Sequence, residues 1–207
     1  MYYEPGRMDH GLRHDPFKSL VVPRPIGWIS TLGRDGVANL APYSFFNAVS
    51  TNPHVVMFCP GARRSPDPHK DSRRNAEETG EFVVNIVTEA LREQMNLTSA
   101  EFAPGVDEMT RAGLKPLPSR RVKAPRVAGS PIHFECVYLQ TVVLPSDDPV
   151  TAAAIVLGQV VGIHIDEAVM TDGMIDMSKF RPIARLGGMD YTVVDNVFTM
   201  NRPDPSA

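Results

Sequence analysis

Alternation of apolar and polar positions in the N-terminal part of the chain predicts three strands. Residues 24–31 are rich in β-branched and aromatic side chains, and residues 37–40 can pair back on them. Residues 33–36, Gly-Arg-Asp-Gly, supply the turn, because glycine and aspartate tolerate the positive φ that a hairpin connection needs. Residues 55–59 form a continuous apolar run, which is typical of a strand buried on both faces.

The middle and the end of the chain add two more strands, a helix and a long hairpin. Residues 82–87 predict a strand, and residues 88–97 predict a helix with Thr88 as its N-cap. Residues 133–142 alternate loosely between apolar and polar and predict a long strand. Residues 151–165 are its expected antiparallel partner, joined through a turn that holds two prolines and two aspartates.

Short strands joined by turns, with few helices, favour a mainly β protein built as an antiparallel barrel. We expect one domain over residues 1–207, with its core at about 20–190, because this length fits a single domain. Residues 1–15 and 200–207 are expected to be peripheral tails. Residues 104–131 carry little periodic signal and many prolines and glycines, so they are expected to run over the surface.

The composition excludes several classes of protein. The net charge is −3 and no basic run is longer than two residues, so nucleic-acid binding is not expected. Every apolar stretch is interrupted well before about 18 residues, which predicts no membrane span, and the N-terminus has no signal-peptide pattern.

Cys59 and Cys136 lie in apolar runs and are expected to be free, buried thiols in a reducing cytoplasm. No Cys or His spacing is typical of a metal site.

The segment that follows the first hairpin mixes hydroxyls, an amide and three aromatic rings. This mixture suits a flat ligand with an apolar body and polar edges. Phe45 and Phe46 are adjacent, so in an extended segment they face opposite sides, one in the core and the other beside the ligand. Ser44, Asn47 and Ser50 offer donors and acceptors to such a ligand, and the backbone amides of the same segment would serve equally.

A Pro-, Gly- and charge-rich loop is predicted over residues 60–74, and loops of this length in a compact domain are usually functional or disordered. Lys70, Ser72 and Arg74 or its neighbour could bind a terminal phosphate, which attracts cations and hydroxyls. The Asp71 carboxylate would repel a phosphate, so it is expected to fix the loop by bonding nearby amides. The residues alone leave a second interpretation open, that of a solvated charged loop.

The last long strand, read with period two, places Gly158, Gly162 and His164 on one face. Glycine weakens a strand, so two glycines on one face suggest the close approach of a ligand or of another backbone. His164 is either a hydrogen-bonded structural histidine or a group beside the ligand. Arg185 precedes Leu-Gly-Gly, whose glycines again suggest a close backbone approach.

Together these segments resemble the signature of the flavin reductase-like family, the FMN-binding split barrels associated with flavoprotein oxygenases. The resemblance spans about residues 20–165. It is carried by residues 24–50, 69–75, 80–86, 93–99 and 104–108, with a weaker match at 185–188. It implies a Greek-key split β-barrel that forms a homodimer, and it favours the phosphate interpretation of the loop.

The resemblance also implies which side chains lie near the flavin. Arg24 and the hydroxyls of Ser30 and Thr31 match positions close to the flavin, and Trp28 is either a ligand contact or a filler of the core or the dimer interface. His164 would orient the flavin or an incoming nicotinamide and is the candidate catalytic residue. The candidate cofactor-binding residues are Arg24, Trp28, Ser30, Thr31, Ser44, Phe45, Asn47, Ser50, Lys70, Asp71, Ser72, Arg74 and Arg185.

The implied function is an FMN-binding oxidoreductase, specifically an NAD(P)H:flavin reductase that supplies reduced flavin to a monooxygenase or another electron acceptor. FAD in place of FMN stays open. NAD(P)H would dock transiently on the flavin, because no strand is followed by the GxGxxG motif of a Rossmann domain. The missing hydrolase motifs do not count against this function, since a flavin performs the electron transfer. The alternatives are a non-catalytic electron carrier reduced by a protein donor, a flavin-storage module and, more remotely, a split barrel for haem or pyridoxine phosphate.

Overall fold

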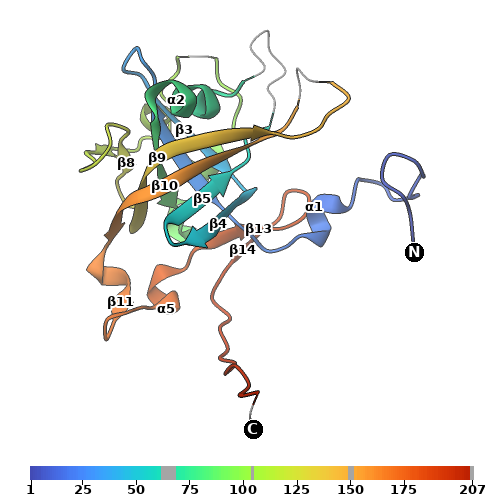
Figure 1. The fold of residues 1–207 in the computed structure, drawn as a ribbon. Helices are drawn as coiled ribbons and strands as arrows, with labels where there is room; N and C mark the ends of the chain where they lie inside the picture. Colours follow the sequence, from blue (N-terminus) through green and yellow to red (C-terminus); the bar gives the residue numbers. More distant parts are fainter. Residues whose placement is uncertain (62–68, 104, 149–151, 206–207) are drawn as a thin grey trace.

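The structure, a computed structural model, describes residues 1–61, 69–103, 105–148 and 152–205. Seven strands form its main sheet: β2 (Gly27–Leu32), β3 (Ala38–Tyr43), β4 (Phe46–Thr51), β5 (His54–Phe58), β6 (Glu81–Ile86), β9 (Ile132–Val143) and β10 (Ala154–Ile165). They pair antiparallel in the order β3-β2-β6-β9-β10-β5-β4. Figure 1 shows this sheet wrapping around the centre of the molecule.

The remaining elements are short. A smaller sheet joins β1 (Arg24–Pro25), β13 (Ile183–Arg185) and β14 (Tyr191–Val193), and two further pairs join β7 (Pro116–Leu117) with β8 (Arg126–Val127) and β11 (Met170–Thr171) with β12 (Met174–Ile175). The helices are α1 (Phe17–Leu20), α2 (Asp71–Thr79), α3 (Arg92–Leu97), α4 (Glu108–Arg111) and α5 (Met177–Phe180), with 3₁₀ turns η1 (Glu89–Leu91) and η2 (Glu167–Val169). The predicted mainly β, antiparallel architecture with a few short helices is confirmed for the described residues.

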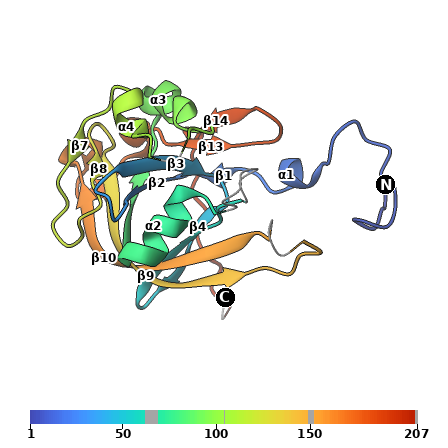
Figure 2. The same cartoon turned by 90° about the horizontal axis from the view of Figure 1, so that it is seen from above.

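The helices lie on two sides of the β2–β3 hairpin. Figure 2 shows α2 on one side and α3, α4 and the β13–β14 hairpin on the other. Both ends of the chain extend away from the barrel, as Figure 1 also shows. Residues 1–15 form no helix or strand, and none follows Val193 among the described residues, while the predicted extent of the two tails stays a prediction. Residues 206–207 of the predicted tail lie outside the described residues.

β2 and β3 form the predicted hairpin, in a register that pairs Ser30 with Leu40. The turn contains Gly36 at φ +82, a conformation that glycine adopts at little cost. β2 is buried at every position from Gly27 to Thr31 because α2 covers one side and the α3–α4 layer covers the other. Its polar side chains are consequently buried as well, and each needs an internal partner.

β5 confirms the predicted strand at residues 55–59, but its neighbour β4 was not expected as a strand. The sequence suggested only a ligand surface of hydroxyl, amide and aromatic side chains there. β4 instead pairs with β5 at the edge of the sheet, where Asn47, Ala48 and Val49 remain exposed. Backbone hydrogen bonds join β4 to β5. An exposed edge strand of this kind therefore does not need alternating apolar side chains.

β9 and β10 form the predicted long hairpin, twelve residues on each side, and part of its turn at 149–151 lies outside the described residues. The register places Val160 opposite Cys136 and Gly162 opposite Glu135, so Val161 is an extra residue, a β-bulge. The bulge shifts the alternation by one position. Gly162 and His164 therefore face the Glu135 side of the sheet, and the prediction that they share a face with Gly158 is wrong.

The close neighbours of the two glycines of β10 also differ. A Cβ added at Gly158 would lie 2.3 Å from Cζ of Phe82, so a core ring fills the space that the sequence assigned to a ligand or backbone. A Cβ at Gly162 would make an ordinary contact, 3.5 Å from Cβ of Glu135. The inference of a ligand at this face is therefore wrong for Gly158.

Residues 71–74 form the first turn of α2 rather than a loop, which corrects the sequence-based prediction. Helix α2 ends at Thr79, and Gly80 caps it with a left-handed φ of +77 while its N–H donates to the Ala76 carbonyl. Residues 62–68 of the predicted loop lie outside the described residues. The predicted helix at 88–97 is present but divided into η1 and α3, and Thr88 makes no side-chain cap.

Two apolar clusters hold the barrel. One packs around the rings of Phe58 and Phe82, whose centroids lie 5.2 Å apart. The other surrounds Trp28 and includes Leu40, Val87, Met95, Met109, Val127 and Ile183. Cys136 is a free, buried thiol of the first cluster, as predicted, whereas Cys59 is free but only half-buried. Burial raises the pKa of both thiols.

The segment expected to run freely over the surface, residues 104–131, is partly built into the fold. Val122, Ala124 and Val127 are buried, and the first two pack with Val83 in a third apolar cluster. Periodicity gave no sign of this, because the segment is held by polar side chains of the sheet rather than by a regular ladder.

Candidate functional site

The end of β3, the N-terminus of α2 and the β13–β14 hairpin surround a cavity of about 360 Å³, the basic cavity. Its described lining residues are Lys18, Arg24, Pro42, Tyr43, Ser44, Phe45, Cys59, Pro60, Gly61, Lys70, Ala153, Arg185 and Gly188. They include two lysines and two arginines, and none of these described lining residues is Asp or Glu. A concave surface with this lining concentrates positive potential and attracts anions.

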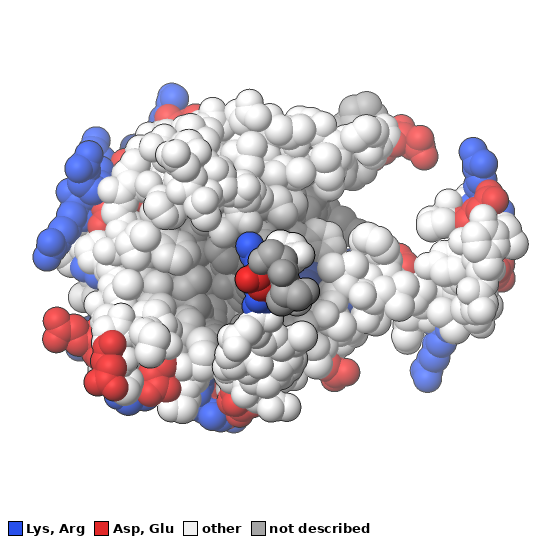
Figure 3. All heavy atoms as spheres, turned by 60° about the horizontal axis from the view of Figure 1, so that its bottom comes forward, with Lys and Arg blue, Asp and Glu red and all other residues white. Residues whose placement is uncertain are grey.

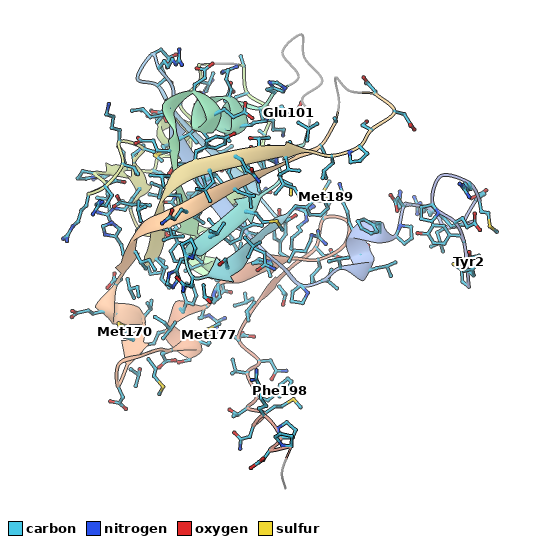
Figure 4. All side chains as sticks on the ribbon, in the orientation of Figure 1. Tyr2, Glu101, Met170, Met177, Met189 and Phe198 are labelled. Carbon is cyan, nitrogen blue, oxygen red and sulfur yellow. The ribbon has the colours of Figure 1, made fainter. Side chains whose placement is uncertain are left out.

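Lys70 directly precedes α2, and its side chain is 28% exposed. Its Nζ lies 3.9 Å from Oε1 of Glu101, whose side chain is 60% exposed and lies beside α2 (Figure 4). Exposed ion pairs of this kind contribute little free energy, so the ammonium can turn toward an anion in the cavity. The N-terminus of α2 adds partial positive charge at the same place.

Arg24 lines the basic cavity, but most of its donors are used inside the protein. Its guanidinium donates to three backbone carbonyls, those of Lys18, Val21 and Leu186. Its Nε lies 3.4 Å from Oγ of Ser44. Burial, and then the charge of Arg185, lowers the pKa of Arg24. Arg24 thus ties the α1 segment to the β13–β14 hairpin, and it offers the cavity positive charge more than free hydrogen bonds.

Arg185 reaches the cavity from β13. Its guanidinium donates to the Tyr191 hydroxyl and the Gly188 carbonyl, and its Cζ lies 4.4 Å from the centre of the Tyr191 ring. The close approach predicted for the following glycines is confirmed at Gly187, where an added Cβ would lie 2.1 Å from Oγ of Ser19. The neighbour is the α1 segment, which packs on the hairpin.

The two adjacent phenylalanines face different surroundings, one the core, as predicted, and the other the basic cavity, and the contact of Phe45 with a ligand stays a prediction. Phe46 is buried and packs over Gly27, where a Cβ would meet its ring at 2.5 Å. Phe45 is exposed, lines the basic cavity, and has the Arg24 guanidinium 5.7 Å from its ring centre. Ser44 lines the same cavity, so this part of the predicted ligand surface is brought together.

A smaller cavity adjoins the basic one and has the opposite charge. Pro42, Tyr43 and Lys70 line both. The smaller cavity is also lined by three carboxylates, those of Asp71, Glu101 and Glu108. An anion is therefore attracted to the basic cavity and repelled by the smaller cavity.

A chain of hydrogen bonds runs along the wall of the smaller cavity and reaches the basic cavity at Tyr43. The Tyr43 hydroxyl donates to Oγ of Ser72 at 2.9 Å, and Ser72 donates to Oδ1 of Asn39 at 2.8 Å. Asn39 donates in turn to Glu108 at 2.8 Å, and Glu108 also accepts the Leu40 N–H at 3.0 Å. Burial raises the pKa of Glu108. The Ser72 hydroxyl is thereby engaged in the interior, although its backbone stays in the first turn of α2.

Asp71 and Arg74 form an ion pair within the first turn of α2. The ion pair joins two residues of this turn, and the predicted bonds from Asp71 to nearby amides stay a prediction. Arg74 lines a separate small cavity with Gly33 and Asn75 and does not line the basic cavity.

Three candidates on β2 lie in the interior. Trp28 is fully buried, and its indole N–H donates to Oγ1 of Thr98 at 2.8 Å. The Ser30 hydroxyl donates to the Pro125 carbonyl, and Thr31 accepts a bond from Asn75 at 3.0 Å. None of these three side chains lines the basic cavity. The core-filler interpretation of Trp28 agrees with this position.

Asn47 and Ser50 lie on the edge strand β4, outside the basic cavity. Asn47 accepts the Ala48 N–H and Ser50 accepts the Asn52 N–H, so both make local turn-like bonds. Their contact with a flavin stays a prediction.

His164 lies at the far end of β10. Its Nε2 is 2.5 Å from Oε1 of Glu135, and its ring is perpendicular to that of His133, with the centroids 6.0 Å apart. Ala153, beside the start of β10, lines the basic cavity, and a strand of this length spans roughly 35 Å. His164 therefore lies far from the basic cavity of the same chain, and its contact with a ligand stays a prediction.

Sequence reasoning missed several residues that line the basic cavity or support it, namely Lys18, Asn39, Tyr43, Cys59 and Glu108. Tyr43 was recognisable as one of the three aromatic residues after the hairpin. Lys18, Asn39 and Glu108 gave no local signal, because their roles depend on contacts between distant segments.

Among the described residues, no group of His, Cys, Asp or Glu is placed to hold a metal ion, and no helix is long and apolar enough to cross a membrane.

The fold and the basic cavity define a mainly β protein with a cavity lined by lysine and arginine at a helix N-terminus, and comparison with known proteins gives its family. Residues 19–184 match the family model described as the flavin reductase like domain. An uncharacterised protein of Aquifex aeolicus is 41% identical over 173 residues, which are 83% of this chain and 85% of that protein. The chain belongs to the flavin reductase like family.

Solved structures agree with this family. Nitrilotriacetate monooxygenase component B from Bacillus cereus superposes with a TM-score of 0.88 at 30% identity, covering 97% of this chain and 98% of that one. A protein from Shewanella frigidimarina, described as a flavin reductase with a split barrel domain, superposes with a TM-score of 0.81 at 24% identity, covering 98% and 100%. The second comparison establishes the likeness in fold alone.

Proposed function

We propose that the protein binds FMN in the basic cavity and acts as an NAD(P)H-dependent flavin reductase that supplies reduced flavin to a monooxygenase. One observation carries this proposal: lysine and arginine side chains from α1, β1, β13 and the start of α2 converge on one cavity whose described lining holds no carboxylate. Family membership and the likeness to a monooxygenase component support the same class of reaction.

The side chains around the cavity match the chemistry of FMN. Lys70 and the N-terminus of α2 would hold the phosphate, because a dianion is stabilised by an ammonium and by helix amides. Arg24 and Arg185 add positive charge in fixed positions. Phe45 offers an exposed aromatic face to the flavin ring, and the cavity volume lies in the usual range for a small-molecule site.

The charge distribution favours FMN over FAD. FAD carries a second phosphate and an adenosine beyond the first phosphate. The cavity next to Lys70 is lined by the carboxylates of Asp71, Glu101 and Glu108, which would repel that second phosphate. We therefore take FMN as the ligand and FAD as the weaker alternative.

When bound, the flavin would accept a hydride from the nicotinamide of NAD(P)H, which is the chemistry that the protein itself lacks. The side chains contribute by binding and orientation. Arg24 is fixed by three carbonyls and lies against Phe45, so the aromatic wall and its neighbouring positive charge are preorganised. Preorganised positive charge beside a flavin stabilises added negative charge without rearrangement of the protein.

We further propose a homodimer of Greek-key split barrels in a reducing cytoplasm. Large apolar side chains are exposed beside or on the edge strand β4 (Phe45, Val49) and on the long hairpin (Leu139, Val142, Val143). Figure 3 shows a broad face with few charged side chains and a hollow near its centre. Phe198, on the C-terminal segment away from the barrel, is also exposed (Figure 4). Such surfaces need cover, and elution as a monomer in size-exclusion chromatography would contradict the dimer.

The experiment that tests the reaction is an anaerobic absorption spectrum of the protein with FMN, taken before and after addition of NADH and then of NADPH. Bleaching of bound flavin by either nucleotide supports the reductase and identifies its electron donor. Flavin that binds but stays oxidised replaces the reductase with an electron carrier reduced by a protein donor. Absence of flavin binding overturns the assignment of the basic cavity.

A further inference from the structure

Another cavity, which shares no described lining residue with the basic cavity, is built on the irregular segment 117–131, which buried side chains hold in place. Glu135 accepts the backbone N–H groups of Arg120, Arg121 and Val122 at 2.8, 2.5 and 3.2 Å. Burial alone would raise the pKa of Glu135, but these bonds and the one from His164 outweigh it and lower the pKa. A buried carboxylate with four donors fixes the segment to β9.

The same segment is fastened at its other end. The Val127 N–H donates to Oδ1 of Asn85 at 2.8 Å, and the Val127 carbonyl lies 3.0 Å from Nε2 of His133. Asn85 and His133 are buried. Since polar groups in the interior hold both ends, the wall that this segment presents to solvent is preformed.

Between this wall and the end of β10 lies a cavity of about 460 Å³, the hairpin-end cavity. Arg120 and Arg126 reach it from the segment, and His164 reaches it from β10. Nε and Nη2 of Arg126 donate to the Pro118 carbonyl, which holds the guanidinium in position and leaves Nη1 for a ligand. Asp166 is the one acidic side chain among the described lining residues, and its carboxylate accepts the Ala168 N–H at 2.9 Å.

The surroundings reinforce this positive charge. Residues 115–132 contain five Lys or Arg and no Asp or Glu, in a chain whose net charge is −3. Figure 3 shows lysine and arginine gathered on the side of the molecule where Figure 1 draws β8. Clustered positive charge of this kind favours an anionic ligand and increases the rate at which it arrives.

The other walls of the cavity are apolar. Ile163 and Ile165 are 52% and 44% exposed, and Leu117 faces them from β7. Exposed branched side chains beside two arginines form an amphipathic surface, with charge on one wall and hydrocarbon on the other. A ligand that covers both walls needs an anionic group attached to an apolar body.

We propose that the hairpin-end cavity binds a small organic carboxylate with an apolar, flat body, such as an aromatic acid. The planar guanidinium groups of Arg120 and Arg126 match a carboxylate, and the ring of the acid would lie on Ile163 and Ile165. The hairpin-end cavity shares no described lining residue with the basic cavity. This proposal therefore stands whether or not the basic cavity binds flavin.

The test is a titration of the full-length protein, with and without added FMN, using benzoate as the probe and uncharged benzamide as its control. Amide NMR shifts report the position of binding. We expect saturable benzoate binding with a Kd on the order of 1 mM, shifts confined to Gly129 and residues 163–166, and no saturation with benzamide. Arg120→Ala and Arg126→Ala should each weaken benzoate binding at least tenfold.

Arg121→Ala is the matched control, because Arg121 is exposed and adjacent but does not line the cavity, and the substitution keeps its N–H bond to Glu135. Unchanged benzoate affinity in Arg121→Ala supports the proposal. A loss of affinity equal to that in Arg120→Ala and Arg126→Ala would contradict it, because benzoate would then be attracted nonspecifically by the whole basic segment. Loss of benzoate binding in Lys70→Ala would assign the ligand to the basic cavity instead. Absence of saturation up to about 10 mM would also overturn the proposal.

Discussion

The Tyr43 hydroxyl donates a hydrogen bond to Oγ of Ser72 at 2.9 Å, and this bond fixes the direction of every bond behind it. Ser72 must then donate to Asn39, whose amide nitrogen donates to the buried carboxylate of Glu108. The chain connects β3, the first turn of α2 and α4. It therefore sets the position of the helix N-terminus relative to the basic cavity.

Ser72→Ala should reduce stability without removing the proposed flavin site. The substitution removes the donor to Oδ1 of Asn39 and the acceptor of the Tyr43 hydroxyl bond, and loss of these buried hydrogen bonds should cost about 1–3 kcal/mol in the free energy of unfolding. Urea unfolding measures this loss. Ser99→Ala is the control, because Ser99 is exposed and donates only to the Asn96 carbonyl of its own turn.

The same variant distinguishes a supporting role from a phosphate ligand. If Ser72 acts through the hydrogen-bond chain, FMN affinity in the Ser72 variant should fall less than in Lys70→Ala. Equal losses in the two variants would mean that the serine hydroxyl leaves Asn39 and binds the phosphate directly.

Lys70→Ala should raise the Kd for FMN at least tenfold while the unfolding midpoint changes little. A charge-assisted hydrogen bond contributes about 1.5–3 kcal/mol, and a tenfold change in Kd corresponds to about 1.4 kcal/mol. The loss of the loose pair with Glu101 costs little by comparison. Fluorescence titration with FMN measures the effect.

Two control variants accompany this measurement. Lys123→Ala removes an exposed lysine that does not line the basic cavity and should leave FMN affinity unchanged. Glu101→Gln releases Lys70 from its ion pair and removes a nearby negative charge, so FMN binding should tighten or stay the same. Weaker binding in Glu101→Gln would show that the carboxylate positions the ammonium.

The sequence predicts those parts of the fold that depend on local pattern. The β2–β3 hairpin follows from Gly36 and its flanking apolar residues, and the β9–β10 hairpin follows from length and alternation. The division between Phe45 and Phe46 follows from the pleat alone. In each case the information lies within about ten residues of the element that it determines.

The parts that could not be predicted depend on distant partners. Ser30 is an unremarkable hydroxyl in the sequence, and only the return of Pro125 across the sheet gives it an internal acceptor. The bulge at Val161 arises from register against β9 and changes the face of His164. A period-two rule cannot include an inserted residue, so the strand was predicted correctly and the position of its histidine was not.

Gly158→Ala should destabilise the protein, whereas Gly162→Ala on the same strand should not. A Cβ at Gly158 would lie 2.3 and 2.4 Å from ring carbons of Phe82, and overpacking of a core costs about 1–3 kcal/mol. At Gly162 the nearest atom, Cβ of Glu135, would be 3.5 Å away, an ordinary contact. Thermal unfolding of the two variants compares them directly.

A double variant identifies the cause of the loss at Gly158. Phe82→Leu removes the ring that the new methyl group would strike, so its effect combined with Gly158→Ala should be smaller than the sum of the two single effects. Simple additivity would show that the backbone, not the phenyl ring, requires glycine at this position.

Stability should rise with pH between about 4 and 6.5 because of His133. Burial lowers the pKa of His133 from 6.5 to about 4, and its Nε2 bonds the Val127 carbonyl. In that window the unfolded chain binds a proton at this histidine and the folded protein does not, so the free energy of unfolding increases with pH. The contribution is complete above about pH 6.5, lost near pH 4, and amounts to about 3 kcal/mol.

His133→Gln isolates this contribution, since an amide can still donate to the Val127 carbonyl but does not titrate. Urea unfolding at a series of pH values from 4 to 7 should give a shallower slope for the variant than for the original protein. The carboxylates titrate in both proteins, so their effect cancels in the difference between the two slopes. Parallel slopes would mean that His133 gains its proton without unfolding, and that the segment held by Val127 opens locally to admit it.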